Sequence, residues 1–122
     1  MLKSYRELLV WQKAINLVVD SYRATAGFPK SETYGLMSQI RRAATSIPAN
    51  IAEGYGRGSR KEYLQFLMIA QGSLKELETH LIVAEKPAYL TNSQTERLLS
   101  SADELGRMLG TLIRKTKANP FP

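Results

Sequence analysis

The chain has 122 residues, 43% of them hydrophobic, which suits the core of one compact domain and is short for two. It contains no cysteine, so disulfide scaffolds and thiolate metal sites are excluded. A formal net charge of +6 raises the expectation of a polyanionic partner. The sequence shows no signal-peptide pattern and no apolar run near the roughly 20 residues that span a bilayer, so we expect a cytoplasmic protein without a membrane partner.

The first expected helix covers residues 5–26. Ser4 and Glu7 have the spacing of a capping box, in which each side chain accepts a hydrogen bond from a free backbone N–H. Apolar residues then recur at three- and four-residue spacing, which predicts the buried stripe. This stripe consists of Leu8, Trp11, Ile15, Val18 and Tyr22. Gly27 and Pro29 end the pattern.

The second expected helix covers residues 32–53 and follows Ser31, a suitable N-cap. Its stripe consists of Leu36, Ile40, Ala43, Ile47 and Ile51. Pro48 lies inside this pattern, and because the apolar period continues past it we expect a kink and not an end. Gly54 then fits the position that follows a helix C-terminus.

The third expected helix covers residues 60–86, after a second capping box formed by Ser59 and Glu62. Its stripe consists of Tyr63, Phe66, Ala70, Leu74, Leu77, Leu81 and Ala84. Pro87 ends the helix.

The fourth expected helix covers residues 92–117, after a third capping box formed by Thr91 and Gln94. Its stripe consists of Leu98, Ala102, Leu105, Leu109 and Leu112. The remaining residues, 118–122, cannot continue a helix, and no strand pattern competes. Four helices of about 20 to 27 residues with short connections predict an all-α protein, an antiparallel up-down-up-down four-helix bundle in one domain over residues 1–122.

The first and third helices also carry apolar residues outside their stripes. These are Leu9 and Val19 in the first helix, and Leu64, Leu67, Met68, Ile69 and Ile82 in the third. A bundle of four helices buries one face of each, so we expect this surplus to form a second contact surface, most simply in a homo-oligomer.

The predicted topology brings the start of the first helix, the connection between the second and third, and the end of the fourth to one end of the bundle. Eight cations fall there: Lys3, Arg6, Arg57, Arg60, Lys61, Arg114, Lys115 and Lys117. Only Glu7, Glu53 and Glu62 oppose them. The stretch from Glu76 to Glu104 is mostly acidic and lies toward the other end, so we expect a molecule that is electrically polar along its axis.

Two segments of this basic end allow a functional and a structural interpretation. The glycines of the 54–58 segment, followed by Arg60 and Lys61, can form an anion cradle at a helix N-terminus, or they can simply supply positive φ angles in a helical hairpin. The cations of the 114–117 segment can contact a polyanion, or they can complement the negative end of the helix dipole.

Arg41 and Arg42 stand next to each other in the second helix, one position off its stripe. They can contact phosphates, lie solvated on the helix flank, or pair with a glutamate across a subunit interface, where the planar guanidinium is favoured.

No catalytic or metal-binding constellation is present in the sequence. His80 is the only histidine, so neither a metal set nor a Ser–His–Asp triad can be completed around it within one chain. Leu77 occupies the position three residues before His80, where the Glu-x-x-His motif of di-iron bundles has its glutamate. We therefore expect no enzymatic activity, no cofactor and no metal.

Four segments resemble the bacterial four-helix-bundle family of proteins encoded within 23S ribosomal RNA intervening sequences. They are ELLVWQKAINLVVDSY, GLMSQIRRAATSIPANIAEGYGR, EYLQFLMIAQGSLKELETHL and LGRMLGTLIRKTK. The block from Ile40 to Gly54 is the most specific part of the resemblance. The resemblance implies a ring-like homopentamer and offers no catalytic residues. A related group, the accessory variability proteins of diversity-generating retroelements, has a similar pentamer with a basic surface and works with a reverse transcriptase and nucleic acid.

The resemblance and the charge together predict a non-enzymatic, oligomeric protein that binds RNA or DNA through basic surface patches. The residues expected to carry this contact are Arg41, Arg42, Arg57, Arg60, Lys61, Arg114, Lys115 and Lys117. The alternative is an oligomeric scaffold that binds a protein partner and has no direct role with nucleic acid. A third hypothesis is an enzyme or small-ligand binder with its site between subunits, near His80 or the arginine pair.

Overall fold

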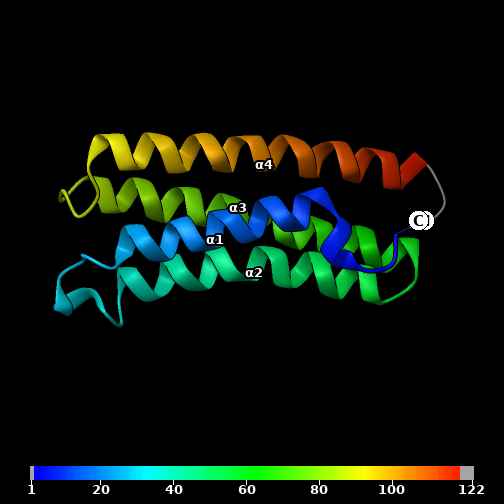
Figure 1. The fold of residues 1–122 in the computed structure, drawn as a ribbon, viewed down its shortest axis with the longest axis horizontal. Helices are drawn as coiled ribbons and strands as arrows, with labels where there is room; N and C mark the ends of the chain where they lie inside the picture. Colours follow the sequence, from blue (N-terminus) through cyan, green and yellow to red (C-terminus); the bar gives the residue numbers. More distant parts are fainter. Residues whose placement is uncertain (1, 119–122) are drawn as a thin grey trace.

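The computed structural model describes residues 2–118, which fold into an antiparallel bundle of four helices (Figure 1). The helices are α1 (Leu9–Thr25), α2 (Leu36–Gly56), α3 (Arg60–Glu85) and α4 (Asn92–Ala118), and the 3-10 turns η1 (Tyr5–Glu7) and η2 (Lys30–Glu32) precede α1 and α2. The predicted all-α bundle is therefore confirmed. Ala118, predicted to lie outside the fourth helix, is the last residue of α4, and the rest of the predicted non-helical tail, residues 119–122, lies outside the described residues.

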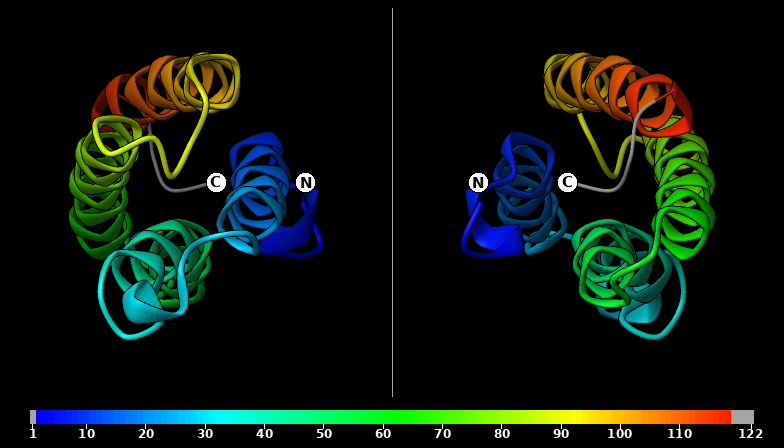
Figure 2. Two further views of the ribbon diagram at one scale, coloured as in Figure 1. Left: turned by 90° about the vertical axis from the view of Figure 1, so that its left-hand side faces the viewer. Right: turned by 90° about the vertical axis from the view of Figure 1, so that its right-hand side faces the viewer.

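The four helices stand around a common axis in chain order, as the end views in Figure 2 show. α2 and α3 form the most extensive contact, α1 packs on α2, and α4 packs on α3. Contact between α1 and α4, the pair that closes the bundle, is the sparsest of the four. The bundle is therefore closed firmly on three sides and loosely on the fourth.

The core consists largely of the stripes predicted for the second, third and fourth helices. Leu36, Phe66 and Leu112 are only partly buried, and the other stripe residues of these helices are buried. The large side chains that are almost completely buried in these three helices are Ile40, Ile47, Ile51, Tyr63, Leu67, Leu74, Leu77, Leu81, Leu105 and Leu109. Leu67, which we counted as surplus, is therefore a core residue.

The stripe predicted for the first helix is only partly correct: Leu8 is buried, and Trp11 and Val18 are partly buried against the core without belonging to its centre. The Ser4–Glu7 capping box forms, but it caps η1; Leu8 is then extended, and α1 begins only at Leu9. The residues of α1 that are buried in the core are Val10, Ala14, Leu17, Ser21 and Thr25. The predicted residues Trp11, Ile15 and Val18 instead line a shallow apolar groove on the outside, against α2, and Tyr22 is exposed. Both stripes have helical spacing, so periodicity could not choose between them.

The second helix begins and ends later than predicted. Its N-cap is Gly35 and not Ser31, and the carboxylate of Glu32 accepts a hydrogen bond of 3.0 Å from the first N–H, that of Leu36. The helix continues through Pro48 to Gly56, so Pro48 does not end it.

Gly54 is not a C-terminal cap but a buried position where α2 approaches α3. A Cβ atom added at Gly54 would lie 2.6 Å from Cβ of Phe66, closer than two carbon atoms can pack. Among the hairpin glycines only Gly58, with a φ of 79°, adopts the left-handed conformation. Gly54 is thus required for close packing, and Gly58 for the turn.

Replacing Gly54 by alanine should destabilise the protein by about 1–3 kcal/mol, because the added methyl group forces α2 and α3 apart. Gly72→Ala is the matched control: Gly72 is in the interior of α3 with open space around it, so alanine should stabilise by about 0.5–1 kcal/mol. Urea unfolding followed by circular dichroism measures both. Equal effects of the two substitutions would contradict the close approach at Gly54.

The buried phenol of Tyr63 makes the stability of the fold depend on pH in the alkaline range. Its ring is fully buried and packs edge-on against Tyr55, with 5.8 Å between the ring centroids. Burial, and to a lesser extent the neighbouring Tyr55, raises the pKa of Tyr63 to about 12. In the unfolded chain the pKa of tyrosine is about 10, so unfolding releases a proton between about pH 10 and pH 12 and stability falls as the pH rises through that window.

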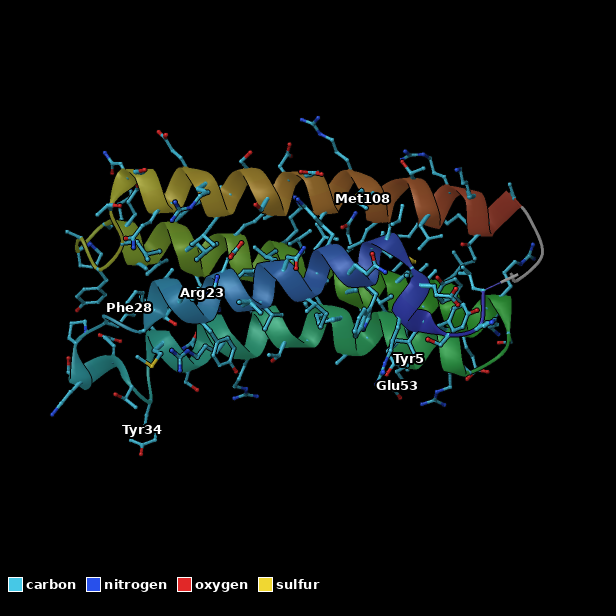
Figure 3. The ribbon with its side chains drawn as sticks, in the orientation of Figure 1. Tyr5, Arg23, Phe28, Tyr34, Glu53 and Met108 are labelled. Atoms are coloured by element: carbon cyan, nitrogen blue, oxygen red, sulfur yellow. The ribbon has the colours of Figure 1, made fainter. Side chains whose placement is uncertain are left out.

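The free energy of unfolding of the native protein should therefore drop by about 1 kcal/mol more than that of Tyr63→Phe when the pH is raised from about 9 to about 11. Tyr34→Phe is the control, because Tyr34 is 95% exposed and projects from the bundle (Figure 3). Denaturant titrations at the two pH values provide the measurement. If Tyr63→Phe and the native protein lose the same stability, the buried phenol does not control the alkaline limit.

Candidate nucleic-acid interface

The structure brings the predicted cations of the chain ends and of the α2–α3 hairpin together at one end of the bundle. Figure 1 shows the start of α1, this hairpin and the end of α4 at the same end. The guanidinium of Arg60, in the first turn of α3, donates a hydrogen bond of 3.4 Å to the backbone carbonyl of Lys117, in the last turn of α4. We call this region the basic end and define it by Lys3, Arg6, Arg57, Arg60, Lys61, Arg114, Lys115 and Lys117.

Nearly all of the net charge of the chain is located at the basic end. Its eight cations face three carboxylates, whereas the rest of the sequence has nine cations and eight carboxylates. The α1–α2 connection lies at the opposite end and contributes Lys30 and Glu32, whose charges cancel. The excess of positive charge therefore lies at the basic end.

Arg57 is already engaged within the hairpin. Its guanidinium lies 2.7 Å from a carboxylate oxygen of Glu53 and 3.5 Å from one of Glu62, and it stacks over the ring of Phe66 at 5.1 Å from the ring centroid. The hydrogen bond to Glu53, together with the attraction of both carboxylates, raises the pKa of Arg57. Arg57 therefore closes the hairpin and forms ion pairs with both of its carboxylates.

The start of α3 is also occupied, which argues against an anion cradle. Ser59 accepts a hydrogen bond of 3.2 Å from the N–H of Glu62, and its hydroxyl lies 3.1 Å from the Glu62 carboxylate. This carboxylate takes the place that a phosphate would have at the positive end of the helix dipole. The geometry favours the structural interpretation of the 54–58 segment.

The cations available for an external ligand lie around this closed hairpin. The side chains of Lys61 and Lys117 are exposed, and neither forms an ion pair within residues 2–118. Arg114 is exposed and donates a hydrogen bond of 3.2 Å to the Thr111 hydroxyl. These side chains can contact phosphate groups without breaking an ion pair.

The arginine pair is separated by the fold. Arg41 packs on the last turn of α1, where Nε donates to the Thr25 hydroxyl at 2.9 Å and Nη2 donates to the Tyr22 carbonyl at 3.2 Å. Its guanidinium also lies over the Tyr22 ring, 4.4 Å from the centroid. Arg41 therefore serves as a cap for α1, supplying a donor and a positive charge to carbonyls at a helix C-terminus.

Arg42 points elsewhere and lines a polar groove between α2 and α3. Gln39, Ser46, Ser73 and Glu76 form the rest of its polar lining. Both arginines belong to the first two turns of α2, while the basic end includes its last turn. The structure therefore does not unite Arg41 and Arg42 with the other predicted contact residues.

The described residues show neither a cluster of potential metal ligands nor a helix that could span a membrane. His80 Nε2 lies 3.6 Å from a carboxylate oxygen of Glu76, and residues 2–118 contain no group of three or more potential metal ligands. Across the same residues no helix combines the length and the apolar character needed to cross a membrane.

Most of the apolar residues that the sequence analysis placed outside the stripes are exposed. On α3 they are Met68, Ile69, Ile82 and Val83, and on α1 they include Leu9 and Val19. The heptad spacing of Lys61, Met68, Lys75 and Ile82 makes this outer line of α3 alternate between lysine and apolar residues. The sequence does not show how these exposed residues of α1 and α3 are arranged in space, because that arrangement depends on how the helices pack.

Comparison with known proteins agrees with this architecture. The model of a family described as 23S rRNA-intervening sequence protein matches residues 6–111. A similar solved structure is a protein of unknown function from the S23 ribosomal protein family of Bacteroides thetaiotaomicron VPI-5482, with 27% sequence identity and a TM-score of 0.77, covering 86% of this chain and 98% of that chain. No curated protein matches the sequence significantly.

Arg41→Ala should destabilise the protein by about 1–2 kcal/mol, because it removes two hydrogen bonds to the end of α1, one of them to a buried hydroxyl. Arg42→Ala, one residue along the chain and exposed, should change stability by no more than about 0.5 kcal/mol. Thermal unfolding of the two variants tests the difference. Comparable losses would show that Arg41 is not the specific cap described above.

Proposed function

The chain belongs to the 23S rRNA-intervening sequence protein family, and we propose that it is a non-enzymatic protein that binds RNA or DNA through the basic end of its bundle. The observation that supports this proposal is the concentration of charge: eight cations against three carboxylates at one end, and near neutrality elsewhere. A localised positive field attracts the phosphate backbone and orients the molecule on it.

The contact proposed is to phosphates and not to bases. Lys61, Arg60, Arg114 and Lys117 are exposed around the closed hairpin. The aromatic rings near this end pack against one another instead of forming an exposed platform: Tyr55 on Tyr63, and Tyr5 on Trp11 at 5.3 Å between centroids. Binding of this kind tolerates different sequences and weakens steeply as the salt concentration rises.

We also propose that the protein acts as an oligomer, a homopentamer being what the family resemblance implies. The exposed apolar residues of α3 support self-association, because a lone bundle leaves them in water. Several basic ends in one assembly would contact one polyanion together, and linked contacts raise the overall affinity beyond that of a single copy.

The double substitution Lys61→Glu with Lys117→Glu should weaken binding to single- and double-stranded RNA and DNA by about tenfold or more. The slope of log K against log salt concentration should become shallower by the equivalent of roughly two phosphate contacts. Both side chains are exposed, so the fold should be retained. The matched control is Lys75→Glu with Lys86→Glu, which changes the net charge equally but away from the basic end.

Fluorescence anisotropy of nuclease-treated protein with labelled oligonucleotides, titrated from about 50 to about 300 mM salt, measures these effects. Equal losses in the two double variants would mean that total charge matters and the basic end does not. Unchanged binding in Lys61→Glu with Lys117→Glu would place any nucleic-acid contact elsewhere. No binding by the native protein at low salt would reject the proposal and favour a protein-binding scaffold.

A further inference from the structure

The residues of α1 and α4 that face each other are polar along most of the seam between the two helices. They recur at i, i+3, i+7 and i+10 on both sides: Lys13, Asn16, Asp20 and Arg23 on α1, and Gln94, Arg97, Ser101 and Glu104 on α4. Lys13 Nζ lies 2.9 Å from a carboxylate oxygen of Glu104. This contact is the only hydrogen bond or ion pair that these eight residues form across the seam.

Two polar grooves occupy the rest of this polar seam. One, of about 450 Å³, lies beside Asn16 and Ser101. The other, of about 380 Å³, is lined by Asp20, Arg23 and Arg97, which are exposed and form no ion pair within residues 2–118. Asp20 and Arg97 carry opposite charges and still do not pair, so the two helices do not close on each other here.

Toward the basic end the seam continues as an apolar groove, lined by Leu9 on α1 and by Met108 on α4 (Figure 3). Leu9 is 70% exposed there. Neither the polar nor the apolar part of the seam therefore seals α1 against α4, in agreement with the sparse contact between these helices.

α1 also contributes less to the core than the other helices. Leu17 is its only large side chain that is almost completely buried, whereas α4 buries three leucines. Two of the five core residues of α1, Ser21 and Thr25, are polar. The Ser21 hydroxyl is buried and has no hydrogen-bond partner among the described residues, which makes its burial unfavourable. Little apolar area is therefore lost when α1 leaves the bundle.

The C-terminal turn of α1 is attached more firmly than the rest of the helix. Arg41 of α2 donates hydrogen bonds to the Thr25 hydroxyl and to the Tyr22 carbonyl. Phe28, three residues after Thr25, is buried in the core. The first turn of α1 has no equivalent, because Leu8 provides no side-chain cap. α1 is thus held at one end by α2 and is weakly joined to α4 along its side.

We infer that α1, with η1 before it, is a hinged strap that detaches from the bundle along the α1–α4 seam while α2, α3 and α4 stay folded. The turn held by Arg41 is the hinge. Local opening of this kind occurs where few apolar contacts must be broken. A helix of 17 residues is marginal by itself in water, so α1 loses its backbone hydrogen bonds when it detaches.

The strap has a consequence for the basic end. Lys3 and Arg6 precede α1 in the chain and move with it, so the docked strap supplies two of the eight cations there and the detached strap removes them. The inference goes beyond the proposed function, and its test needs no nucleic acid.

Hydrogen exchange of the full-length protein, followed by mass spectrometry, provides the first test. Amides of residues 13–21 in α1 should exchange at least about tenfold faster than those of residues 67–77 in α3 and 102–109 in α4. Equal protection of the three segments would overturn the proposal. Faster exchange in α4 than in α1 would also overturn it, because α4 would then be the helix that detaches.

A covalent bridge across the seam provides the second test. The chain has no cysteine, so Asn16→Cys with Ser101→Cys can be joined specifically by a short bis-maleimide. Both positions line the same groove, and Asn16 is exposed, so the fold should be retained. The bridge should slow the exchange of residues 13–21 by about tenfold or more, toward that of α3. The same variant with each thiol capped by N-ethylmaleimide is the matched control and should keep the fast exchange.

A bridge across a tightly packed pair of helices separates strap opening from unfolding of the whole bundle. Ser46→Cys with Ser73→Cys joins α2 to α3 by a disulfide at a place where the native hydroxyl oxygens are 2.5 Å apart. This bridge should leave the exchange of residues 13–21 unchanged. Equal slowing by the two bridges would mean that α1 exchanges only when the whole bundle unfolds, and would overturn the proposal. An unaltered exchange of α1 in the variant bridged between α1 and α4 would overturn it as well.

Discussion

Phe66 packs directly against the backbone of α2 at Gly54, and the basic end depends on this contact. The distance of 2.6 Å between Cβ of Phe66 and a Cβ added at Gly54 leaves no room for any side chain there. The Phe66 ring in turn supports the guanidinium of Arg57, which holds Glu53 and Glu62 on both sides of the hairpin. Both carboxylates are bound by Arg57, and Lys61 and Lys117 form no ion pair with them. A packing constraint in the core thereby determines the electrostatics of the surface.

The same contact explains why some predictions from sequence succeed and others fail. The stripes of α2, α3 and α4 each have one apolar face, so helical spacing identifies the core and with it the bundle. The role of a glycine cannot be read in this way, because Gly54 and Gly58 differ only in what surrounds them. Gly54 is needed where another helix approaches, and Gly58 where the backbone turns. Only tertiary structure separates these two requirements.

The arginine pair shows the equivalent difficulty at the candidate site. Arg41 and Arg42 are chemically identical neighbours, and their helical positions differ by about 100°. Because of this rotation, the side chain of Arg41 contacts the end of α1 through Thr25, which is 16 positions earlier in the chain. The side chain of Arg42 instead lines the groove between α2 and α3.

α1 is the helix whose apolar surface exceeds what one bundle can bury. Ala14 and Leu17 face the core, Trp11 and Ile15 line the outer groove against α2, and Leu9 lies in the groove against α4. A helix that is apolar on several sides is normally surrounded by other elements. In this bundle α2 covers one side of α1 firmly, while α4 covers the opposite side only in part. This incomplete cover leaves Leu9 70% exposed at the first position of α1, so α1 is the helix with apolar surface that the single bundle does not bury.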